Sequence, residues 1–115
     1  MDQELSIRQD QQGDILILRI SGKLDFLSTS LLEDTLKQIL NQSKNKLVLD
    51  LSNVSYISSP GLKLLLELSK RLKALSGKFV IFGLQPFPLE IIKDTNFDVF
   101  LEITETEQEA LAKFS

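Results

Sequence analysis

The sequence is 115 residues long, carries a formal net charge of -3 and contains neither cysteine nor histidine. This length suits a single domain with its own core. The two missing residue types exclude disulfides, thiolate zinc sites, cysteine nucleophiles and histidine-based catalysis. The 13 basic and 16 acidic residues are interspersed, so no basic stripe is available for nucleic acid.

The first half of the chain alternates between strand and helix patterns. A short alternating segment, ELSIRQ, precedes the apolar run DILILRIS, which is typical of a strand buried on both faces. Gly13 and Asp14 lie near the turn between them. Apolar residues then recur at helical spacing behind serine and threonine capping candidates, which predicts a helix from about residue 30 to 41. The run KLVLDLS predicts a second buried strand.

The second half continues the same alternation. After the SSPG turn, a leucine-rich helix is expected to reach about Leu75 and to end at Gly77. KFVIFGL predicts a third buried strand, a short helix begins near Pro86, and VFLEI predicts a last strand. The TETE segment, residues 104–107, has the spacing of a capping box and predicts a final helix that ends near Phe114.

This alternation predicts one α/β domain over residues 1–115, with parallel crossovers between strands. The loops SGKLDF, SNVSYISSP and GLQPFP follow the buried strands and should share the edge where such sheets carry their sites. The segment MDQELSIRQDQQGD is too polar for a secretory signal, and no apolar run is long enough to span a bilayer. We therefore expect a cytoplasmic protein without a membrane span.

The loop YISSPGLKLLL places two hydroxyl groups between a buried strand and a helix. Composition and spacing favour a structural reading, in which Ser59 caps the helix and Pro60 is its first residue. A nucleophilic serine lacks a histidine partner, and SSPGL is not a nucleophile elbow. A serine–lysine pair with Lys23 or Lys63 is the remaining enzymatic alternative, and nothing in the sequence indicates an activated lysine. We predict that the protein is not an enzyme.

The helix after the serines has one apolar stripe, which should pack on the sheet. Its members are Leu64, Leu65, Leu68, Leu72 and Leu75. Leu62 and Leu66 fall outside that stripe, on the side of Ser59 and near Lys63. They either form an exposed docking patch or contact the neighbouring helix.

Other candidate sites are weaker. Asp25 in GKLDF is either a turn or helix-entry residue or a recognition carboxylate. The acidic residues between 102 and 109 do not converge, which argues against a metal site. No glycine motif for nucleotides is present, so we expect no cofactor.

Three segments in this order and spacing resemble the STAS domain, in particular the free-standing bacterial anti-sigma factor antagonists. They are SGKLDFLSTSLLEDTL, KLVLDLSNVSYISSPGLKLLL and GKFVIFGLQPFPLEIIKDTNFDVFLEITETEQEAL. The resemblance runs from about Ile15 to Leu111. It implies a single STAS domain with a mixed four- to five-stranded sheet, a mostly parallel core and about four flanking helices.

The resemblance also assigns roles to single residues. The family loop reads Asp-Ser-Ser-Gly-Leu or Asp-Ser-Ala-Gly-Leu, so its phosphoacceptor serine falls on Ser59 and its aspartate on Ser58. The next three positions are Pro60, Gly61 and Leu62. Pro60 removes a backbone donor there. The family's Gly-x-Leu-Asp segment places its aspartate on Asp25.

These residues, together with Lys63 and Leu66, are the expected partner-binding site. The implied partner is a serine-kinase anti-sigma factor of the histidine-kinase-like ATPase class, bound by the unphosphorylated form so that a sigma factor is released. A PP2C-type phosphatase would reverse phosphorylation. From the alternation of strands and helices we also expect a monomer. The alternative is a non-switching STAS interaction or scaffold module of a transporter-associated or sensory assembly.

Overall fold

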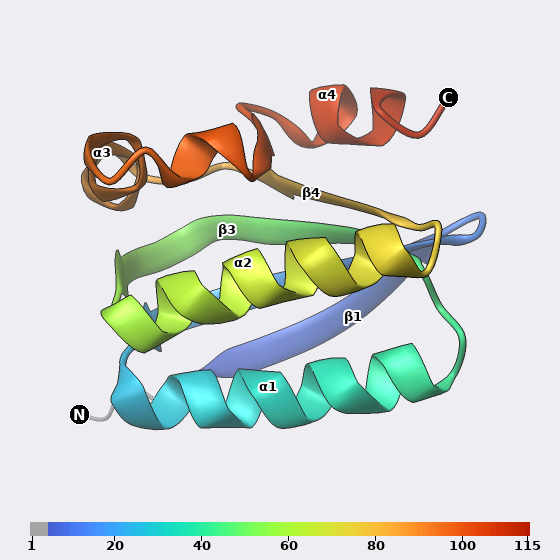
Figure 1. Cartoon of the computed structure of the whole chain (residues 1–115), viewed down its shortest axis with the longest axis horizontal. Coiled ribbons are helices and arrows are strands. Elements are labelled where there is room, and N and C mark those ends of the chain that lie inside the picture. The colour runs from blue at the N-terminus through green and yellow to red at the C-terminus, as the bar shows by residue number, and fades with distance from the viewer. Residues whose placement is uncertain (1–4) are drawn as a thin grey trace.

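The computed structural model describes residues 5–115, which form a five-stranded sheet with helices on both faces (Figure 1). The elements in chain order are β1 Ser6–Gln12, β2 Ile15–Leu24, α1 Phe26–Asn41, β3 Lys46–Ile57, α2 Ser59–Ala74, β4 Lys78–Phe82, α3 Pro86–Asp94, the 3-10 helix η1 Phe97–Val99, β5 Glu102–Thr104 and α4 Glu107–Ala112. Within residues 5–115, every helix is too short or too polar to cross a membrane.

The strands lie in the order β1-β2-β3-β4-β5. β1 is antiparallel to β2, and the pairs from β2 to β5 are all parallel. The predicted α/β fold, with its mixed sheet and mostly parallel core, is therefore confirmed. The three continuous apolar runs are the adjacent strands β2, β3 and β4, as their burial on both faces requires.

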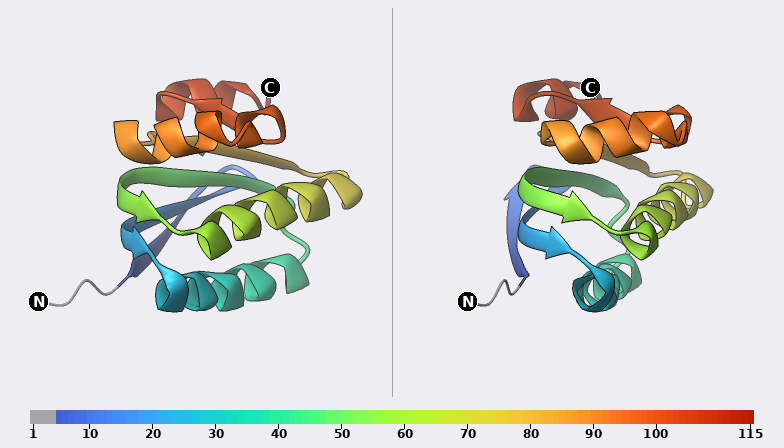
Figure 2. Two further views of the ribbon diagram at one scale, coloured as in Figure 1. Left: turned by 60° about the vertical axis from the view of Figure 1, so that its left-hand side comes forward. Right: turned by 90° about the vertical axis from the view of Figure 1, so that its left-hand side faces the viewer.

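Helices cover the two faces unequally. The larger core joins one face of the sheet to α1 and α2, and Ile92 of α3 belongs to the same core. Figure 2 shows α1 and α2 side by side on that face. The other face has a smaller core, in which Ala110 of α4 packs with Ile17, Val48 and Val80.

One arginine anchors α4 to this second face. The Arg19 guanidinium on β2 contacts the carboxylates of Asp10, Asp50 and Glu107 at 2.5, 3.1 and 2.9 Å. Hydrogen bonds to Glu107 and Asp10 raise the pKa of Arg19, and the bond from Arg19 lowers the pKa of Asp10. Because Glu107 is the first residue of α4, this cluster positions the helix.

Several predicted element boundaries are wrong. α1 begins at Phe26 and not near residue 30, because Asp25 caps it. The capping box of α4 pairs Thr106 with Glu109, two residues later than expected, and the helix ends at Ala112. The last strand is only three residues long, since the chain forms η1 immediately before it.

The end of α2 also differs from its prediction. Leu75 is 52% exposed and caps the helix, so it is not part of the core stripe. Ser76, with φ of 59°, takes the left-handed position expected to favour glycine. Gly77 donates its N–H to Leu72 O at 2.7 Å, and a Cβ at Gly77 would collide with Asn45 O. Glycine is needed at position 77 for this close approach, and α2 itself ends earlier, at Ala74.

Candidate functional site

The carboxyl ends of β2 and β3 lie side by side, and α1 and α2 begin there (Figure 1). The Ser58 N–H donates to Leu24 O at 2.8 Å, which joins the loop after β3 to the end of β2. The loop after β4 reaches the same edge, where Gln85 Nε2 donates to Ser52 O at 3.0 Å. Two of the three predicted loops are wrong over most of their length, because residues 21–24 continue β2 and residues 52–57 continue β3. Only the last residues of SGKLDF and SNVSYISSP lie between strand and helix at this edge.

Ser58, and not Ser59, is the N-cap of α2. The Ser58 hydroxyl accepts from the Gly61 N–H at 3.2 Å, and the Ser58 carbonyl accepts from the Leu62 N–H at 2.9 Å. The expected cap at Ser59 is therefore wrong by one residue. The physical reason is burial: Ser58 is only 8% exposed, so its hydroxyl needs a partner. Pro60 has no N–H, which leaves Gly61 as the donor within reach.

Ser59 is the first residue of α2, and both Ser59 and Pro60 are exposed. In the part of the chain that the structure describes, the Ser59 hydroxyl has no hydrogen-bond partner. The two serines therefore differ in kind: the Ser58 hydroxyl is committed to the fold, whereas the Ser59 hydroxyl is accessible.

Gly61 and Leu62 are structural. A Cβ at Gly61 would lie 3.0 Å from Ile57 Cγ2 and 3.3 Å from Leu24 O, so glycine lets α2 approach the strand ends closely. Leu62 is 5% exposed and belongs to the larger core, which contradicts its expected position outside the core stripe. Leu66 is half-buried against the same core, and Lys63 is exposed.

Asp25 caps the neighbouring helix. Its Oδ1 accepts from Ser28 N at 2.9 Å and from Ser28 Oγ at 2.7 Å. The hydrogen bond from the Ser28 amide lowers the pKa of the Asp25 carboxyl. Of the two readings of Asp25, the helix-entry reading is confirmed, and its carboxylate still lies at the exposed edge.

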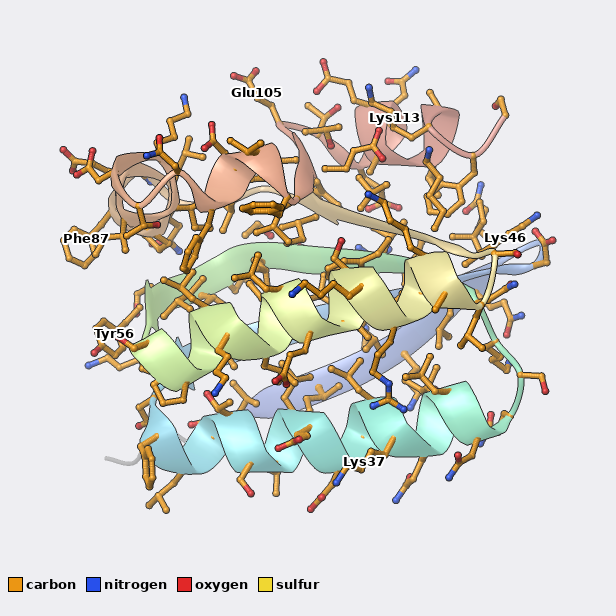
Figure 3. The ribbon with its side chains drawn as sticks, in the orientation of Figure 1. Lys37, Lys46, Tyr56, Phe87, Glu105 and Lys113 are labelled. Atoms are coloured by element: carbon orange, nitrogen blue, oxygen red, sulfur yellow. The ribbon has the colours of Figure 1, made fainter. Side chains whose placement is uncertain are left out.

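Large exposed apolar side chains lie at the starts of α1 and α3 and near the end of β3, and the sequence analysis did not single them out. Phe26 is 75% exposed, Leu27 79%, Phe87 55% and Tyr56 40%. We call these four residues the edge patch. Figure 3 shows Tyr56 and Phe87 at the end of the molecule where α1 and α2 begin. Their positions in or beside the three predicted edge loops were the available signal.

A family model describing the STAS domain matches residues 6–110. The chain belongs to the STAS family. Two curated relatives carry functional names. BtrV of Bordetella bronchiseptica, a candidate anti-sigma factor antagonist by name, is 26% identical over 110 residues, covering 96% of this chain and 95% of BtrV. The anti-sigma-F factor antagonist RsfB of Mycobacterium tuberculosis is 32% identical over 74 residues, covering 64% of this chain and 57% of RsfB.

Solved structures agree on the fold. The crystal structure of an anti-sigma factor antagonist from Mycobacterium paratuberculosis superposes with a TM-score of 0.89, covering 98% of this chain and 96% of that chain at 23% identity. At that identity the likeness supports the STAS architecture alone.

Exposed apolar side chains and the starts of helices determine the chemistry of this edge. Among residues 5–115, the His, Cys, Asp and Glu side chains form no group of three or more that could hold a metal ion. The edge instead combines the edge patch with two helix N-termini, whose partial positive charge favours an anion. An apolar surface around an accessible hydroxyl can be changed by one added charge.

Proposed function

We propose that this STAS protein is an anti-sigma factor antagonist that binds a serine-kinase anti-sigma factor through the edge patch and is released when Ser59 is phosphorylated. The observation that carries this proposal is the accessible Ser59 hydroxyl at the start of α2, together with the four exposed apolar side chains of the edge patch. The family membership and the names of BtrV and RsfB support the general role.

Phosphate at Ser59 would change binding without unfolding the chain. It adds about -1.5 to -2 charges and lies at the positive end of α2, which the helix tolerates. In a complex, the same charge would lie beside Phe26, Leu27 and Tyr56 and would lose its hydration. Affinity therefore falls because the loss of hydration in the complex costs more than the one pairing that Lys63 offers.

The choice of Ser59 over Ser58 follows from accessibility. A kinase must reach the hydroxyl, and Ser58 is 8% exposed with its hydroxyl in the cap of α2. Lys63 lies four residues after Ser59 and is exposed, so it can pair with the phosphate on the helix surface. Asp25, Ser58, Pro60 and Gly61 then act by shaping the loop around this hydroxyl.

The partner surface needs one revision. Leu62 is in the core and contributes through the fold. We assign the apolar contact to the edge patch instead, with Leu66 as a smaller contributor because it is half-buried. A PP2C-type phosphatase would restore the binding form.

The test uses the cognate anti-sigma factor kinase from the native cell. Wild type incubated with kinase and ATP should gain one phosphate on Ser59, and Ser59→Ala should gain none. Ser59→Ala should bind the kinase constitutively, whereas Ser59→Asp should bind at least tenfold more weakly and keep its melting temperature. Gln38→Glu is the matched control, since it adds one negative charge at an exposed position of α1 about three turns from Phe26. Phosphate on Ser58, or equal labelling of wild type and Ser59→Ala, would contradict the proposal.

A STAS module that does not switch predicts another pattern. Such a protein would bind its partner equally well as wild type, Ser59→Ala or Ser59→Asp. It would also remain unlabelled by every kinase of the native cell extract.

A further inference from the structure

A second exposed apolar surface lies away from Ser59, where the later turns of α2 face the chain after α3. Val99 is 75% exposed and Phe100 is 60% exposed. Ser69 Oγ on α2 donates to Phe100 O at 3.1 Å, which places this segment beside the helix (Figure 1). Neighbouring apolar side chains that remain exposed to solvent are typical of contact surfaces.

A hollow of about 340 Å³ adjoins these two residues. Buried Phe79 and Leu101 contribute to its lining, together with Val99, Phe100 and the side chains of Lys73 and Lys78. We call Val99, Phe100, the hollow and its two lysines the η1 surface. Its volume is at the lower end of the range for small-molecule sites, about 300 to 1,000 Å³, which suits a single anchoring side chain.

The charge of this region is opposite to that of the whole chain. The chain has a net charge of -3, whereas the charged residues that line the hollow are two lysines and one glutamate. The acidic residue of the hollow, Glu102, is already contacted by Lys78 at 3.5 Å and Lys113 at 3.7 Å. Lys73 has no ion-pair partner within residues 5–115. The η1 surface is therefore apolar and positively charged.

We propose that the η1 surface binds an acidic peptide segment of a second protein, with one apolar side chain of that peptide inside the hollow. Charge complementarity selects acidic residues beside Lys73, which has no ion pair of its own among the described residues. The hollow favours an inserted side chain over a flat lipid surface, and a peptide strand or helix can supply both features.

This surface extends beyond the proposed function because it can be occupied together with the edge. Ser69 and Lys73 are ten and fourteen residues after Ser59 along α2, a separation of about 15 to 21 Å at 1.5 Å per residue. A partner on the η1 surface would therefore leave Ser59 accessible and would connect the STAS domain to a larger assembly.

The test is a selection of random 12-residue peptides displayed on phage against the full chain. Enriched peptides should contain several Asp or Glu residues around one Leu, Ile, Phe or Trp. A synthetic copy should shift the amide resonances of Val99, Phe100 and Lys73. Lys73→Glu and Val99→Ser should each weaken its binding at least tenfold at an unchanged melting temperature. Enrichment of basic or neutral peptides, or no enrichment, would overturn the proposal.

Two further measurements test two other occupants of the η1 surface, a lipid bilayer and a second copy of this chain. Binding to vesicles that contain phosphatidylserine, or dimerisation in sedimentation experiments, would overturn the proposal if Val99→Ser abolished either one. Ser59→Asp is the independent control and should keep wild-type affinity for the peptide. Because the kinase assay uses the edge patch, a failed peptide experiment and a failed switch give separate results.

Discussion

Replacing Leu62 by alanine should destabilise the fold by about 2 to 5 kcal/mol. The side chain is 5% exposed and lies in the core that joins α2 to the sheet. Its removal costs the transfer free energy of the lost atoms and leaves a cavity beneath the first turn of α2. Domains of this size unfold with about 5 to 15 kcal/mol, so the substitution removes a large part of the total.

Urea unfolding at 25 °C, followed by circular dichroism, measures this loss. With a slope near 2 kcal/mol per molar urea, the midpoint should fall by about 1 to 2.5 M. Leu27→Ala is the matched control because Leu27 is 79% exposed, and its effect should stay within about 0.5 kcal/mol. If Leu62→Ala unfolded at the midpoint of Leu27→Ala, the side chain would lie on the surface and the reasoning would fail.

Three further changes test the caps, the close approaches and the ion cluster. Gly77→Ala should cost about 1 to 3 kcal/mol or more, as its Cβ would collide with Asn45 O; an unchanged melting temperature would count against this packing. Asp25→Ala should cost about 0.5 to 2 kcal/mol, with Asp25→Asn retaining most of the cap; equal losses in both variants would contradict capping. Arg19 holds the pKa of Asp10 below its ordinary 3.8, so Asp10 stabilises the fold above that pH and loses its contribution as pH falls through the lowered value. Asp10→Asn should therefore show a smaller drop in melting temperature between pH 5 and pH 2 than wild type does, and an equal drop would disprove the linkage.

The strands could be predicted from the sequence because the runs around Leu18, Leu49 and Ile81 are apolar without interruption. All three residues are fully buried in the central strands. A continuous run needs no knowledge of its neighbours to indicate burial on both faces. The α/β order and the shared edge of the loops followed from these runs and from the helices between them.

The start of α1 and the width of the core face of α2 could not be predicted in the same way. Phe26 and Leu27 are apolar but exposed, so they do not fit the spacing of an amphipathic helix. An argument from that spacing therefore places the helix start after the true cap at Asp25. Leu62 is buried because the start of α2 lies closely against the strand ends at Gly61. Helical periodicity gives the centre of an apolar face, whereas its width depends on tertiary neighbours.

The choice between Ser58 and Ser59 also needed the structure. Adjacent serines before Pro60 satisfy the capping rule in either register. The deciding fact is that the Ser58 N–H bonds to Leu24 O and draws that residue inward. A pairing between segments 34 residues apart leaves no local pattern.

The tight turn at Gly13, with φ of +63°, has a consequence for the order in which the chain folds. β1 and β2 are joined through Gly13 and Asp14 alone, so this hairpin can form in about 1 to 10 μs. The parallel pairs β2–β3 and β3–β4 must first close loops that contain α1 and α2, and this entropy delays them. During synthesis from the N-terminus, the hairpin is therefore available as a template while the later strands are still being made. Its apolar residues Leu16, Leu18 and Ile20 stay exposed to solvent until α1 and α2 pack on them. Aggregation is therefore most favoured during this interval of folding.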